Sequence, residues 1–202
     1  MRIFAFAMAL AASPVAASEL TTQITDQQIL PAFHRLAADA ALLAQAAEHD
    51  CNAQSASLQT AYGTVFDAWI AVSHYRFGPT EIDSRAFALA FWPDSRSKTP
   101  KALRTLIQKE DAGIHDPTQF ASYSIAARGF YALEFLLYDP EISNAGSATY
   151  RCALTRAIST DIAATTLAIS NDWQQNYATE MYSPTNRYQS DDEITQELFK
   201  AL

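Results

Sequence analysis

The sequence predicts an all-α fold, a mostly antiparallel helical bundle with one irregular segment after the second helix. Glycine is rare, with five residues in 202, and the alternation of apolar and polar residues that indicates β-strands is nearly absent. Long segments instead carry apolar residues at spacings of three and four, the period of an amphipathic helix. Two of the segments begin with a capping residue followed by proline, a combination that favours a helix start.

The first 17 residues have the features of a secretory signal peptide. Arg2 supplies the positive start, residues 3–10 form a short apolar core, and residues 15–17 are small. The apolar run is well short of the ~20 residues that a membrane-spanning helix needs. No later segment is long and apolar enough to span a membrane. We therefore expect an exported, periplasmic protein whose mature chain begins at Ser18.

Two long helices are predicted next, at residues 27–50 and 55–75. The apolar face of the first consists of Leu30, Phe33, Leu36, Ala40, Leu43 and Ala47. The second places Leu58, Tyr62, Val65, Trp69 and Val72 at alternating spacings of four and three, as in a packed bundle. Residues 77–100 should be irregular, because Gly78, Pro79 and Pro93 interrupt helical hydrogen bonding there.

The second half of the chain is predicted to form helices at residues 99–109, 116–138, 149–181 and 194–202. Thr99 and Asp116 are each a capping residue followed by proline at the first helical position. Ser190 and Glu193 have the spacing of a capping box, which favours the start of the final helix.

Glu134 is the most unusual residue, because it is the only charged residue in the apolar run 129–138. If residues 116–138 form one helix, it shares a stripe with Phe120, Ala127, Phe130 and Leu137 and faces the core. A buried carboxylate needs an arginine, hydrogen-bond donors or a metal ion opposite it. The candidate partners are Arg76, Arg128 and Arg151. A structural ion pair, with Arg76 preferred, is the simpler interpretation, and a metal or ligand site is the alternative.

The same segment resembles the signature of the imelysin family, in which glycine, any residue, histidine, any two residues and glutamate precede an apolar run. Here Gly129, Tyr131 and Glu134 occupy these positions. Further landmarks occur in the family's order at Trp69, 75–79, 91–94, 150–153 and 172–173. Tyrosine replaces the histidine, so a hydrogen bond suits the pair better than a metal ion, although tyrosine binds ferric iron at some sites.

The resemblance implies a periplasmic helical protein connected with the uptake of iron or another metal, and iron or zinc as its metal ion. Gly129, Tyr131 and Glu134 would form the motif position of a binding or accessory protein without catalytic residues. A metallopeptidase of the insulin-cleaving type is one alternative, and a structural or interaction module of the cell envelope is another. Imelysins commonly carry a second helical half, so the resemblance favours residues 18–202 as the N-terminal half of a longer protein. The alternative is that the last helix docks on the bundle.

The histidines do not form a ligand motif. They are His34, His49, His74 and His115. No two are spaced i and i+4, and the His-Glu-any-any-His pattern of zinc peptidases is missing. Only His74 is a site candidate. Trp92, together with Tyr75, Phe77 and Phe91, either lines a ligand pocket or packs a loop onto the bundle. We expect residues 77–100 to form one wall of any pocket.

The two cysteines, Cys51 and Cys152, are expected to form a disulfide, because paired cysteines in an exported protein are usually bonded. The net charge of −8 argues against nucleic acid and anionic membranes as partners. The classes of partner that remain are a metal ion, a small ligand and an envelope protein.

Overall fold

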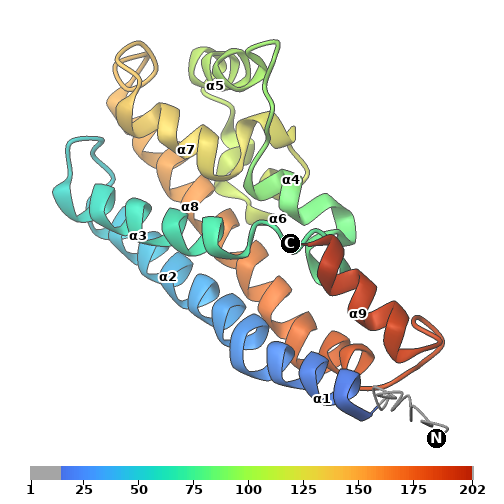
Figure 1. The fold of residues 1–202 in the computed structure, drawn as a ribbon. Coiled ribbons are helices and arrows are strands. Elements are labelled where there is room, and N and C mark those ends of the chain that lie inside the picture. Colours follow the sequence, from blue (N-terminus) through green and yellow to red (C-terminus); the bar gives the residue numbers. More distant parts are fainter. Residues whose placement is uncertain (1–14, 202) are drawn as a thin grey trace, which may run out of the picture.

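The computed structural model describes residues 15–201, which form an all-helical bundle, as the sequence predicts (Figure 1). Its α-helices are α1 (Val15–Ile24), α2 (Leu30–His49), α3 (Ala56–Val72), α4 (Arg85–Leu89), α5 (Lys98–Lys109), α6 (Pro117–Ala121), α7 (Gly129–Tyr138), α8 (Ala148–Asp172) and α9 (Asp191–Lys200). The predicted signal peptide falls largely on residues 1–14, outside the described residues. Within residues 15–201, no helix has the length and apolar character needed to cross a membrane.

The two longest helices, α2 and α8, pack against each other in antiparallel orientation (Figure 1). At one end, a disulfide joins Cys51, just after α2, to Cys152 in the first turns of α8, with a Cα–Cα distance of 5.0 Å. At the other end, the rings of Phe33 and Trp173 stack at 5.6 Å. The predicted disulfide is therefore confirmed, and it holds the central helix pair together at one end.

Helices α3 and α7 also contribute to the core. The predicted apolar face of α3 is buried, and Phe66 and Trp69 contact Phe130 of α7 at ring distances of 5.6 and 6.0 Å. The hydroxyl of Tyr62 donates to the Phe130 carbonyl at 3.3 Å. Helix α7 also packs along α8, so it lies between two elements that are far apart in the sequence.

Both ends of the α2–α8 pair contain irregular helical turns. A π-helical turn at Thr25–Ile29 joins α1 to α2, and another at Trp173–Tyr177 follows α8. The first turn precedes Pro31, which lacks the N–H that an α-helix would use, so the hydrogen-bond ladder shifts by one residue there. The predicted helices 27–50 and 149–181 are thus located correctly but are not uniform.

The segment 77–100 is irregular, as expected. It contains two short 3-10 turns, Gly78–Thr80 and Ile82–Ser84, which are followed by α4 and then by the start of α5. Helix α5 begins one residue before the predicted Thr99. The cap is supplied by Asp94, whose carboxylate accepts the N–H groups of Lys98 and Thr99 at 2.7 and 2.8 Å. The final helix α9 begins at the predicted Ser190 cap, whose hydroxyl accepts the Glu193 N–H at 3.3 Å, but the Glu193 carboxylate accepts the Gln189 N–H at 2.7 Å, so only the serine half of the capping box forms. The helix packs on α1.

The predicted helix 116–138 is wrong, because the chain is interrupted twice there. Asp116 caps only the short α6, and a 3-10 turn at Ile125–Ala127 follows. Arg128 is extended, with φ −126° and ψ 168°, and Gly129 has φ +73°. The helical phase is lost across these residues, so Phe120 cannot be used to predict which face of α7 is buried.

The disulfide should contribute strongly to stability. It closes a loop of about 100 residues, for which chain entropy alone gives up to about 4–5 kcal/mol. Titration of unfolded, unreduced protein should detect no free thiol, and reduction should lower the urea midpoint. A Cys51→Ser/Cys152→Ser variant should unfold like the reduced protein. Two titratable thiols per chain in the unreduced protein would contradict the pairing.

Candidate functional site

The motif residues lie on α7, and the helix does not bury Glu134. Its buried residues are Gly129, Phe130, Ala132, Leu133, Leu136 and Leu137. Tyr131 is half-buried and Glu134 is exposed, on the side of α7 away from this apolar face. The expectation that Glu134 faces the core is therefore wrong. The physical reason is the break before Gly129, which sets the rotation of α7 independently of α6.

The three candidate arginine partners are all used elsewhere. Arg76 pairs with Glu81 at 2.6 Å on the surface, and its guanidinium lies over the Phe87 ring at 4.9 Å. Arg151 donates to the carbonyls of Ala145 and Gly146 in the turn before α8. Among the residues that the structure describes, no arginine or lysine forms an ion pair with Glu134.

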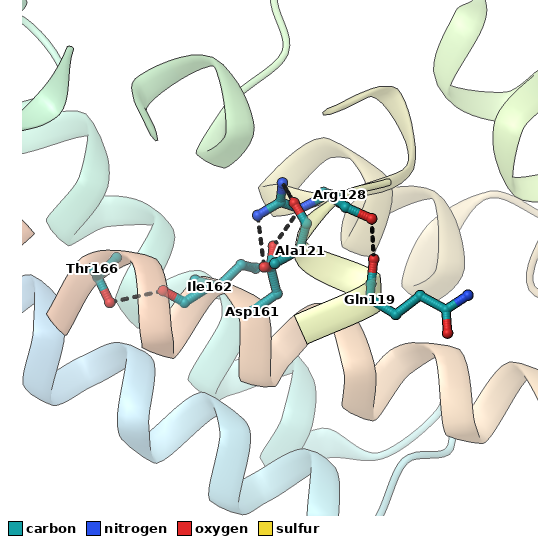
Figure 2. Close-up of polar contacts among 7 residues, drawn as sticks. Gln119, Ala121, Arg128, Asp161, Ile162 and Thr166 are labelled. Carbon is teal, nitrogen blue, oxygen red and sulfur yellow. Dashed lines mark hydrogen bonds and ion pairs between the residues drawn. The ribbon is translucent and has the colours of Figure 1, made fainter. Parts of the chain in front are cut away.

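Arg128 forms the most buried ion pair, and its partner is Asp161 in the middle of α8 (Figure 2). The Arg128 Nε and Nη2 atoms donate to the two Asp161 oxygens at 2.9 and 2.7 Å. The two side chains are only 10% and 9% exposed. Arg128 Nη1 also donates to the Ala121 carbonyl at the end of α6. One guanidinium thus ties α6, the start of α7 and α8 together, with the bidentate geometry that makes such pairs strong.

Sequence reasoning missed Asp161, although a signal was present. Asp161 is the only acidic residue between positions 148 and 171, and it is next to Ile162 on the predicted inner face of that helix. The argument that singled out Glu134 therefore applied better to Asp161.

The structure explains why residue 129 is glycine: its backbone conformation and its close neighbours leave no place for a side chain. A Cβ atom there would lie 2.2 Å from the Ala88 carbonyl oxygen and 2.3 Å from that of Leu89. The backbone at Gly129 also has φ +73°, a conformation that strains other residues. The glycine lets the first turn of α7 contact the end of α4, rather than supplying a ligand itself.

Glu134 lies among aromatic residues. Its charge acts on Tyr62, Tyr131 and Tyr138. The Tyr131 ring contacts Phe66 at 6.1 Å and Trp92 at 5.9 Å, and Trp92 is 67% exposed. The irregular segment 77–100 therefore reaches the motif through Trp92. We call Tyr131, Glu134, Tyr138 and Trp92 the α7 face.

The pKa values of Tyr131 and Tyr138 are both raised above the usual 10.0. Burial is the larger cause, and the charge of the Glu134 carboxylate is the second. Both effects disfavour the phenolate, since burial desolvates it and the carboxylate repels it. The same two causes, in the same order, raise the pKa of Tyr62. These phenols are therefore neutral hydrogen-bonding groups at physiological pH.

This donor set does not suit a resident catalytic zinc. Zinc sites use several histidine, cysteine or carboxylate ligands in close tetrahedral array, and no cluster of three such residues occurs within the described part of the chain. His74 is exposed and packs beside Tyr75, with ring centroids 4.0 Å apart. Tyr75 and Phe77 belong to the buried aromatic core around Trp173, so packing and not a pocket explains them.

The role of Gly129 can be tested against a second glycine. Gly129→Ala should destabilise the protein by more than about 2 kcal/mol, because the side chain enters a left-handed conformation and meets two carbonyl oxygens. Gly63→Ala is the control. It lies inside α3 with nothing within 4 Å of the added Cβ, so it should stabilise by about 0.5–1 kcal/mol. Urea unfolding of both variants measures the difference, and a Gly129→Ala variant as stable as wild type would contradict this role.

Comparison with known proteins agrees with this architecture. The crystal structure of an imelysin-like protein from Psychrobacter arcticum 273-4 superposes with a TM-score of 0.75 at 20% sequence identity. The match covers 96% of this chain but only 62% of that protein. No curated protein matches the chain. The imelysin family model (Peptidase_M75) matches residues 29–202, which include every helix from α2 to α9. The chain therefore belongs to the imelysin family.

Proposed function

We propose that this protein is a non-catalytic binding or accessory protein of the imelysin type that acts in the periplasm in the uptake of iron or another metal. One observation carries the proposal. Tyr131 and Glu134, at the family's motif positions, lie on the outward side of α7, and Glu134 has no ion-pair partner among the described residues. A cation that binds Glu134 would not have to replace an arginine or lysine of the protein, so the carboxylate is available for binding.

Iron as cargo fits the oxygen donors of this face better than zinc as a cofactor. A carboxylate and a phenol are hard ligands that favour ferric iron, and tyrosine is an established iron ligand. Two protein donors leave most coordination positions to other molecules, such as a small chelator. Binding of this kind is weak and exchangeable, which suits transfer of a metal and not hydrolysis.

The phenol proton makes the proposed binding pH-dependent. Metal coordination requires the Tyr131 phenolate, and the raised pKa of Tyr131 means that a proton must be displaced. Below that pKa, affinity for ferric iron should therefore increase with pH, by up to about tenfold per unit for one released proton.

The proposed location rests on two sequence features. Residues 1–17 have the pattern of a signal peptide. The Cys51–Cys152 disulfide is the kind of bond that persists in an oxidising compartment.

The peptidase alternative is less well supported, because water activation by zinc needs three protein ligands and the α7 face offers one carboxylate. The interaction-module alternative has one specific observation in its favour. Trp92, which contacts Tyr131, and Tyr138 are 67% and 49% exposed, and exposed aromatic residues are common at protein interfaces.

Thermal melts with and without ferric citrate test the metal proposal. Wild type should gain stability by mass action, about 2.7 kcal/mol at one hundred times the dissociation constant, and more at pH 8 than at pH 6. Glu134→Ala should show no gain. Tyr131→His replaces the phenolate by imidazole, a softer ligand, and should bind ferric iron more weakly and with less dependence on pH. Asp67→Ala removes an exposed carboxylate from α3 and should behave as wild type.

Citrate without iron is the ligand control. If neither wild type nor Tyr131→His is stabilised by iron at any pH, the metal proposal fails, and the α7 face is then best explained as a protein-interaction surface.

A further inference from the structure

A cavity of about 490 Å³ lies away from the α7 face, between α8 and the segment 112–121. It exists because α8 presents small residues there, including Ala153, Ala157 and Ala164. The opposite wall is apolar and includes Ile114 and Phe120. The volume is within the range of about 300–1,000 Å³ that is typical of small-molecule sites. The expectation that residues 77–100 form a wall of any pocket is wrong for this cavity, which they do not line.

Arg156 supplies the cavity with hydrogen-bond donors that the fold does not use. Its Nε donates to the Ala47 carbonyl at 3.3 Å, and its Nη2 donates to the Glu48 carbonyl at 3.1 Å, which caps the end of α2. A guanidinium has five N–H donors. Within residues 15–201, Arg156 Nη1 has no hydrogen-bond partner. The arginine is therefore held by two backbone carbonyls, its Nη1 group is free, and its side chain, 39% exposed, belongs to the cavity lining.

The other charged groups of the cavity leave Arg156 as the available ion. Both oxygens of Asp161 are bonded to Arg128, so this carboxylate is already neutralised. Glu48 lies 3.4 Å from Arg156, but its side chain is 65% exposed, and an ion pair with that exposure is weak. His115 and Thr160 add exposed polar groups to the lining.

We propose that this cavity binds a small organic carboxylate with an apolar body. The carboxylate accepts from Arg156, and the body packs between Ile114, Phe120 and Ala157. Charge and shape agree, because the one ion with free donors is cationic and the remaining walls are mainly apolar. This site is separate from the α7 face and does not depend on metal binding there.

Phenylacetate and 2-phenylethylamine are suitable probes, because they share an apolar ring and carry opposite charges. In an NMR titration of the intact protein, phenylacetate should shift amides of residues 112–121 and 153–164 in a saturable manner, and the amine should not. Arg156→Gln should weaken phenylacetate binding at least about tenfold, the value of a charge-assisted hydrogen bond. Glu48→Gln should strengthen it, because a competing carboxylate is removed.

Two variants in which an alanine is replaced by leucine keep the test valid if Arg156→Gln unfolds. Ala157→Leu fills the cavity without touching a hydrogen bond and should abolish binding, whereas Ala38→Leu, exposed on α2, should not change it. The proposal is overturned if the amine binds there in place of phenylacetate, if neither probe binds, or if Ala157→Leu binds phenylacetate as wild type does.

Discussion

The buried ion pair between Arg128 and Asp161 is the interaction on which the rest of the site depends. It joins the residue just before α7 to the middle of α8, and the same guanidinium holds the end of α6. Both charges are nearly excluded from water, so either one without the other would be costly. The pair therefore selects the arrangement in which the chain extends at Arg128 and turns at Gly129, and this arrangement sets the rotation of α7.

The rotation of α7 divides the family's motif into two roles. Gly129 belongs to the packing of α7 on α4, where no side chain fits. Tyr131 and Glu134 lie outside this packed face, and Tyr131 contacts Trp92 from the irregular segment. A carboxylate at the surface among aromatic rings binds partners more readily than a buried one, which would be held by its own counter-ion. The function we propose follows from this difference in position.

Local features of the sequence predicted most of the fold. The apolar faces of α2 and α3 follow from spacing alone, and Asp116 and Ser190 cap helices as their sequence positions indicate. The break between Ala121 and Gly129 was not predictable in the same way, because its causes are contacts with Asp161 and Leu89, which are distant in sequence. Glu134 was misplaced for that reason. The cavity beside Arg156 was also beyond reach, since it needs the mutual position of α8 and residues 112–121.

Amide hydrogen exchange in α7 tests most directly whether the Arg128–Asp161 pair fixes this helix. In Arg128→Met, Asp161 stays buried without its partner, which should lower the free energy of unfolding by roughly 3–5 kcal/mol. Residues 117–138 should then lose protection more than α2 or α3 does. Arg128→Met/Asp161→Leu removes both charges and should restore most of the protection, while Arg76→Met, from an exposed pair, should match wild type. Unchanged protection of α7 in Arg128→Met would contradict the account.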